Sequence, residues 1–149
     1  MSVDLIHMWH KRARPKPDSR AFNVQLGCHF EEIAEMVETL VFHAPGGHSP
    51  GELTKVYTGL KAFADALKSG EMCAEIKDRK EFLDAMCDQV VTSIGAGYCA
   101  NMNPSEAIRR VNTSNWTKID TVTGEFIRDG NGKIMKPSNY LPPDLEGTY

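Results

Sequence analysis

The residues of this sequence that are best suited to chemistry are carboxylates in two stretches without any basic residue. Residues 21–54 contain no Lys or Arg, and residues 81–108 contain none either. The acidic residues of the two stretches are Glu31, Glu32, Glu35, Glu38 and Glu52, and Glu81, Asp84, Asp88 and Glu106. Exposed helices usually place Lys three or four residues from Glu, because such a pair stabilises the helix by about 0.2–0.5 kcal/mol. Carboxylates without such partners suit hard divalent cations, which prefer oxygen ligands.

Helical geometry groups these carboxylates further. Successive residues of an α-helix turn by about 100°, so Glu32 and Glu35 lie about 60° apart, with Glu31 beside them. On a second helix, Asp84 and Asp88 lie about 40° apart. If the two helices pack antiparallel through their apolar stripes, the acidic edges meet, and a cation must balance their charge. We therefore expect a Mg²⁺ site, with Mn²⁺ as an alternative ion.

Four helices are expected to carry these residues. Apolar residues recur every three or four positions, and capping residues stand at Ser49, Asp78 and Asn103, so the predicted helices cover residues 26–42, 50–68, 78–100 and 104–114. Residues 1–20 are expected to form a short helical turn and a loop. Residues 124–136 resemble a β-hairpin closed by a glycine-rich turn, and residues 137–149 an extended tail. These features predict an all-α, four-helix bundle in one domain, residues 1–149, with its helical core at 26–118 and the hairpin and tail at 119–149.

Composition limits the function classes. The chain has 149 residues, 41% of them hydrophobic, which is enough for one core. Its net charge of −3 does not favour binding of nucleic acid. No apolar run approaches the roughly 20 residues that span a bilayer, and the first residues do not resemble a signal peptide, so we expect a cytoplasmic protein without membrane contact.

At its acidic residues the sequence resembles a known family, the all-α nucleoside triphosphate pyrophosphohydrolases of the MazG-like group, which includes phosphoribosyl-ATP pyrophosphohydrolase. The first family motif, EExxE, matches Glu31-Glu32-Ile-Ala-Glu35. The second, ExxD on a later helix, matches Glu81-Phe-Leu-Asp84 literally. In the family, however, the aspartate of this motif lies directly before an apolar stretch, and Asp88 matches that position. Asp84 would then replace the glutamate of the motif. We favour Asp84 and Asp88 and leave the role of Glu81 open.

A third family motif, Asn-x-x-Lys after the last bundle helix, matches Asn115-Trp-Thr-Lys118. In the family, these side chains contact the phosphates or the sugar of the nucleotide. The matches cover residues 26–118. The tail around Lys136 resembles extensions of phage-encoded members, and Lys136 is a further candidate for phosphate binding.

The resemblance implies Mg²⁺-dependent hydrolysis of a nucleoside triphosphate to a monophosphate and pyrophosphate, in the control or clean-up of nucleotide pools. It implies metal binding by Glu31, Glu32, Glu35, Asp84 and Asp88. Glu31 would also orient the attacking water or accept its proton. Family members are dimers or tetramers, so a homodimer or homotetramer is expected.

Two other functions remain open. The first is metal binding without nucleotide chemistry, for which His7, His10, Cys28 and His29 are candidate zinc ligands, although their spacing fits no standard site. The second is an oligomeric interaction protein whose basic arm, residues 1–20, docks on an acidic partner or nucleic acid.

Overall fold

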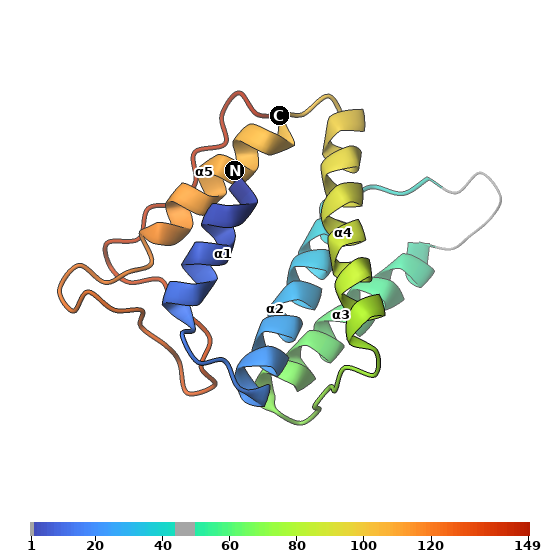
Figure 1. Ribbon diagram of the computed structural model, residues 1–149. Coiled ribbons are helices and arrows are strands. Elements are labelled where there is room, and N and C mark those ends of the chain that lie inside the picture. Colours follow the sequence, from blue (N-terminus) through green and yellow to red (C-terminus); the bar gives the residue numbers. More distant parts are fainter. Residues whose placement is uncertain (1, 44–49) are drawn as a thin grey trace. The chain divides into compact units, whose positions relative to one another are not determined.

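The structure, a computed structural model, describes residues 2–43 and 50–149. Its helices are α1 (Ser2–Ala13), α2 (Ser19–Glu38), α3 (Pro50–Ser69), α4 (Arg79–Cys99) and α5 (Pro104–Trp116) (Figure 1). The prediction of an all-helical fold is confirmed. Contacts divide the chain into two compact units. The α2–α3 unit consists of Lys16–Ala74 and Asp129–Lys133, and the α5 unit consists of Met1–Pro15, Glu75–Arg128 and Ile134–Tyr149.

In the α2–α3 unit, two long helices pack side by side (Figure 1). Their contact buries Val24 and Ala34 of α2 against Ala64 and Leu67 of α3, all 0% exposed. Gly27 permits this close packing, because a Cβ atom at residue 27 would lie 2.8 Å from the carbonyl oxygen of Ala64. The aliphatic contact therefore depends on a small residue in α2.

The start of α2 differs from the prediction. The helix begins at Ser19 rather than near residue 26, because the side chain of Asp18 accepts a hydrogen bond from the amide of Ala21 at 2.7 Å and caps it. It ends at Glu38, before the predicted end at residue 42. Helix α3 begins at Pro50, as predicted, while its predicted cap Ser49 lies outside the described residues.

The segment 129–133 completes the α2–α3 unit. Arg20 of α2 donates hydrogen bonds to the carbonyl oxygens of Leu67 and Lys68 at the end of α3, and to Asn131 Oδ1 at 3.1 Å. The segment itself is held by the carboxylate of Asp129, which accepts bonds at 2.9 Å from the amides of Asn131 and Lys133. One arginine thus links the start of α2, the end of α3 and a distant loop.

The α5 unit is organised around α5. Helix α1 is longer than the predicted helical turn, because Trp9 gives it a tertiary anchor. The indole Nε1 of Trp9 donates to the carbonyl oxygen of Asn115 at 2.8 Å, and the ring meets Phe126 at 5.4 Å between centroids. The last residues of the chain follow α5, where Arg110 Nη1 donates to the carbonyl oxygens of Asp144 and Glu146 at 3.0 and 2.9 Å.

The joint between α4 and α5 is tightly packed. Asp78 and Asn103 cap the two helices as predicted. A Cβ atom at Gly97 would lie 2.8 Å from Pro104 Cγ, so α4 ends directly against the first turn of α5. The amide of Asn103 also donates to the carbonyl oxygen of Thr148 at 2.8 Å, which fixes the end of the chain at this corner.

The predicted β-hairpin is not found. The described residues contain two isolated antiparallel bridges, Ile119 with Phe126 and Arg128 with Ile134, instead of a continuous ladder. Near them, backbone hydrogen bonds run from the amide of Met135 to the carbonyl oxygen of Ile127 at 2.9 Å and from the amide of Asp129 to that of Lys133 at 3.0 Å. Asn139 Nδ2 donates to the carbonyl oxygens of Thr117 and Ile119 at 3.0 and 2.9 Å. The glycine-rich turn itself is present, with Gly132 at a φ of +82°.

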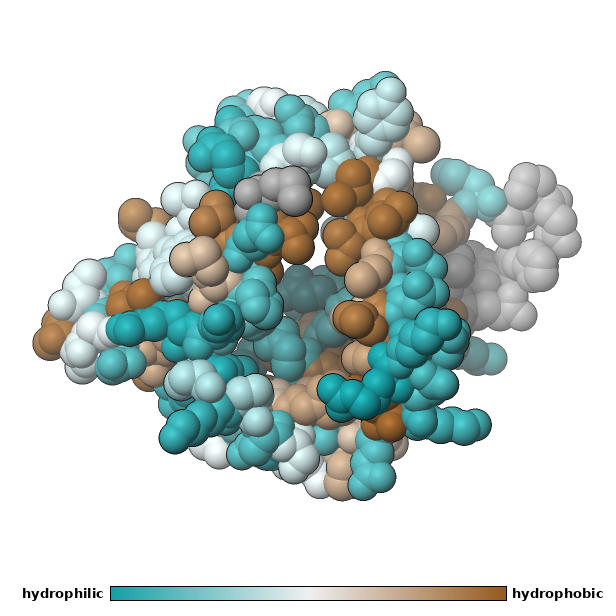
Figure 2. Space-filling model, in the orientation of Figure 1, coloured by the Kyte–Doolittle hydropathy of each residue, from teal (hydrophilic) through white to brown (hydrophobic). Residues whose placement is uncertain are grey.

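Helix α4 has no buried residue. Leu83, Val91 and Tyr98 are 64%, 67% and 75% exposed. Figure 2 shows hydrophobic side chains at the surface over this helix. No described helix is both long enough and apolar enough to cross a membrane. Apolar residues thus lie on several sides of α4, and they are exposed.

Candidate functional site

The predicted site residues lie in both units. Glu31, Glu32 and Glu35 belong to α2 in the α2–α3 unit. Asp84 and Asp88 belong to α4 in the α5 unit, together with the predicted phosphate-binding residues Asn115, Lys118 and Lys136. That the two acidic groups share a metal ion stays a prediction.

Glu31 lies in a cluster of lysines that the local sequence did not reveal. Its side chain is 16% exposed. Oε1 accepts a hydrogen bond from Lys68 Nζ at 2.7 Å, and Oε2 accepts one from Lys133 Nζ at 3.0 Å. Lys61 Nζ lies 3.9 Å from Oε1. The stretch around Glu31 contains no lysine, but α3 and segment 129–133 supply the counter-charges.

These lysines change the acidity of Glu31. Burial by itself would raise the pKa of the carboxyl group, but the hydrogen bonds and charges of Lys68 and Lys133 outweigh burial and lower the pKa below its ordinary value. Lys68 responds in the opposite sense. Burial would lower its pKa, but hydrogen bonds to Glu31 and Asp65 raise it. Glu31 and Lys68 therefore stay charged at neutral pH, and Glu31 is a weak proton acceptor.

Replacing Glu31 with Gln should reduce the free energy of unfolding at pH 7 by about 1 kcal/mol, because Lys68 and Lys133 lose a charged acceptor. The pKa of Glu31 is lower in the folded state than its ordinary value of 4.5. Its stabilising effect is therefore present above pH 4.5 and is lost as the pH falls through the folded-state pKa. Urea unfolding of both proteins between pH 3 and pH 7 measures this difference. Equal stability at pH 7 would contradict the role of the cluster.

The other predicted metal ligands differ from Glu31, because no described lysine or arginine pairs with them. Glu32, Glu35, Asp84 and Asp88 are exposed, and none has an ion-pair partner among the residues that the structure describes. Glu81 is different, since Lys80 Nζ lies 3.9 Å from it and its amide donates to the capping residue Asp78. Exposed carboxylates are ligands that Mg²⁺ accepts, whereas both oxygens of Glu31 already accept hydrogen bonds from lysines.

Within the described ranges, no three His, Cys, Asp or Glu side chains are grouped closely enough to hold a metal ion. Glu32 and Glu35 on α2, and Asp84 and Asp88 on α4, stay predicted ligands, and neither pair has a third such side chain beside it in the described part of the chain. Each pair would provide two carboxylate ligands, and Mg²⁺ commonly binds through one or two carboxylates, with waters and phosphates filling its other positions.

The two predicted phosphate-binding lysines meet at one aromatic ring. Lys118 Nζ lies 5.9 Å and Lys136 Nζ 5.1 Å from the ring centre of Tyr140. Lys118 Nζ also lies 5.8 Å from the ring centre of Trp9. Trp9 and Tyr140 were not among the predicted site residues, although aromatic rings are common partners of lysine. Two cations beside one ring suit a phosphate group.

Tyr140 is fixed by α5, which positions the lysine pair. Its hydroxyl lies 3.2 Å from Ser114 Oγ, and Ser114 Oγ donates to the carbonyl oxygen of Leu141 at 2.6 Å. Ser114 is buried on the same helix that carries Asn115. Asn115 and Lys118 therefore lie close in sequence to Ser114. The contacts of Ser114 with Tyr140 and Leu141 hold the tail that carries Lys136.

Comparison with known proteins does not extend this description. No protein-family model matches the chain, no curated protein is significantly similar to it, and no solved structure is significantly similar to it.

Proposed function

We propose that this protein is a Mg²⁺-dependent nucleoside triphosphate pyrophosphohydrolase of the MazG-like type. In this reaction, water attacks the α-phosphorus, the bond between the α-phosphorus and the bridging oxygen breaks, and the products are a nucleoside monophosphate and pyrophosphate. The observation that carries the proposal is the separation of charge among the site residues. Four exposed carboxylates have no ion-pair partner among residues 2–43 and 50–149, while Lys118 and Lys136 gather at Tyr140.

Each group has a role that its surroundings support. Glu32, Glu35, Asp84 and Asp88 would hold Mg²⁺, which supplies charge neutralisation at the phosphates and lowers the pKa of bound water. Lys118 and Lys136 would bind phosphate oxygens as cations with several donors. Asn115 would orient the nucleotide through its amide.

Glu31 takes a different role from the one expected. Because Lys68 and Lys133 occupy both of its oxygens, we assign it as a positioning residue that holds segment 129–133 on α2 and α3. Its lowered pKa does not favour acceptance of a proton from water.

A panel of canonical and modified NTPs and dNTPs with Mg²⁺, scored by pyrophosphate release, tests the proposal. We expect release from at least one of them, with chelator abolishing it. Release of orthophosphate instead of pyrophosphate, or inactivity on the whole panel, would overturn the proposal. Binding of zinc by the inactive protein would then favour the metal-binding alternative.

We also propose that α4 forms a contact between two copies of the chain. A two-fold contact of this kind would cover the exposed Leu83, Val91 and Tyr98. Light scattering should then give at least twice the chain mass of 16.6 kDa. Val91→Glu should reduce this mass to that of one chain, while the matched charge change Gln89→Glu should not. A monomeric parent protein would contradict the proposal.

A further inference from the structure

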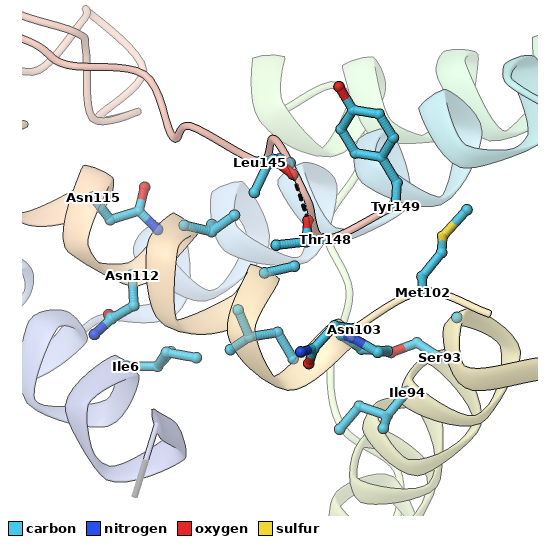
Figure 3. A pocket seen from close by; sticks show the side chains of 15 residues that line it. Ile6, Ser93, Ile94, Met102, Asn103, Asn112, Asn115, Leu145, Thr148 and Tyr149 are labelled. Carbon is cyan, nitrogen blue, oxygen red and sulfur yellow. Dashed lines mark hydrogen bonds between the residues drawn. The ribbon is translucent and has the colours of Figure 1, made fainter. Parts of the chain in front are cut away.

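A largely apolar pocket of about 440 Å³ lies within the α5 unit (Figure 3). Ile94 and Gly97 of α4 form one wall, and Ala107 and Val111 of α5 form another. Ile6 of α1 lines it too, and the end of the chain contributes Leu145, Thr148 and Tyr149. This volume is within the range of small-molecule sites, which are typically apolar with a few polar groups.

The polar residues that line this pocket are Ser93, Asn103, Thr148, Tyr149 and two amides one helical turn apart on α5. Asn112 and Asn115 both line it (Figure 3). Asn112 is only 5% exposed, and its Oδ1 has no hydrogen-bond partner in the described part of the chain. A buried amide without a partner destabilises a fold, so its presence in an apolar lining indicates a use other than packing.

A short series of contacts connects this end of the pocket with the lysine pair. The carbonyl oxygen of Asn115 accepts the indole hydrogen bond of Trp9 at 2.8 Å. The ring of Trp9 lies 5.8 Å from Lys118 Nζ. Lys118 and Lys136 share the ring of Tyr140. The α5 unit thus combines an apolar pocket, two amides and two cations.

We infer that this pocket binds the nucleobase of the substrate, an inference that rests on the proposed function. A nucleobase is a flat ring with apolar faces and an edge of hydrogen-bond donors and acceptors. The side chains of Ile94 and Val111 suit the faces, while an asparagine amide offers donors and an acceptor to the edge. Rotation about the last side-chain bond of Asn112 brings either end of its amide toward the ligand.

The amides and the lysines favour a nucleotide over a purely apolar ligand. An acyl chain or an apolar peptide side chain would use the aliphatic walls but neither amide. A nucleotide has groups for all three features of the α5 unit, since its base suits the apolar walls and the amides and its phosphates suit the cations.

Ala107→Phe fills the pocket and tests the inference. With the most active nucleotide of the panel, we expect KM to rise at least about tenfold with kcat nearly unchanged, because the base loses its place while the phosphate site remains. Ser105→Phe, on the exposed side of the same helix, is the matched control and should leave KM unchanged. An unchanged KM in Ala107→Phe would overturn the base pocket and leave the hydrolase proposal standing.

Asn112→Leu separates binding from packing. Because leucine removes a buried polar atom without a partner, Tm should rise, while affinity for a nucleoside without phosphates should fall at least about tenfold. The affinity is measured from amide NMR shifts, so the test also applies to an inactive protein. A lower Tm with unchanged nucleoside affinity would mean that Asn112 is structural, and absence of nucleoside shifts at α5 in the parent protein would refute the pocket assignment.

Discussion

Glu35→Gln and Asp88→Asn should each reduce pyrophosphate release by about 10²–10³-fold, because each removes a charged oxygen ligand of Mg²⁺ without removing volume. Both side chains are exposed and neither has an ion-pair partner among the described residues. The free energy of unfolding should therefore stay nearly unchanged. Initial rates at saturating Mg²⁺ and thermal unfolding of the same samples provide the measurement.

Glu38→Gln is the matched control for these variants. Glu38 is an exposed glutamate of the same helix but lies outside the motif, at the last residue of α2. Its replacement should retain parental activity. Full activity of Glu35→Gln or Asp88→Asn would remove these carboxylates from the proposed metal site, and equal losses in all three variants would indicate a general effect of negative charge instead.

Gly27→Ala should destabilise the protein by about 1–3 kcal/mol, although alanine favours a helix over glycine. The new methyl carbon would lie 2.8 Å from the backbone carbonyl oxygen of Ala64 and 3.3 Å from Leu67 Cβ. A backbone atom cannot rotate away, so α2 and α3 must separate and expose part of their buried contact. Equilibrium unfolding in urea measures the change.

Gly59→Ala should change stability in the opposite direction. Gly59 is also in a helix of this unit, but a Cβ atom there would have no neighbour within 4 Å. Helix propensity then acts alone and should stabilise the protein by about 0.5–1 kcal/mol. If both substitutions stabilise the protein, the close contact between α2 and α3 at residue 27 is wrong.

Local features explain which helices could be predicted. The starts of α4 and α5 depend on side chains two or three residues away, and Asp78 and Asn103 act as the sequence indicated. The start of α2 was missed because Pro15 and Pro17 favoured a loop, although a proline just before the cap Asp18 is compatible with a helix. Helix α1 depends on Trp9 contacting α5 more than 100 residues away, so its local pattern could not show its full length.

The candidate site was predictable only where charge patterns are local. The lack of nearby lysines in the sequence predicted that Glu32 and Glu35 have no ion pair, and none is found in the described part of the chain. For Glu31 the same argument was wrong, because Lys68 and Lys133 come from positions 37 and 102 residues further along the chain. The gathering of Lys118 and Lys136 at Tyr140 depends on how the tail packs on α5, which no periodicity encodes.

The membership of segment 129–133 in the α2–α3 unit has a consequence for biosynthesis. Both helices of this unit are complete once residue 69 has been made, but Asn131 and Lys133 come 62 and 64 residues later. On a ribosome, α2 and α3 can pair long before Arg20 and Glu31 receive these partners. The unit therefore reaches its final set of polar contacts only after α4 and α5 have been synthesised. In a nascent chain arrested before residue 129, Glu31 lacks Lys133 and Arg20 lacks Asn131.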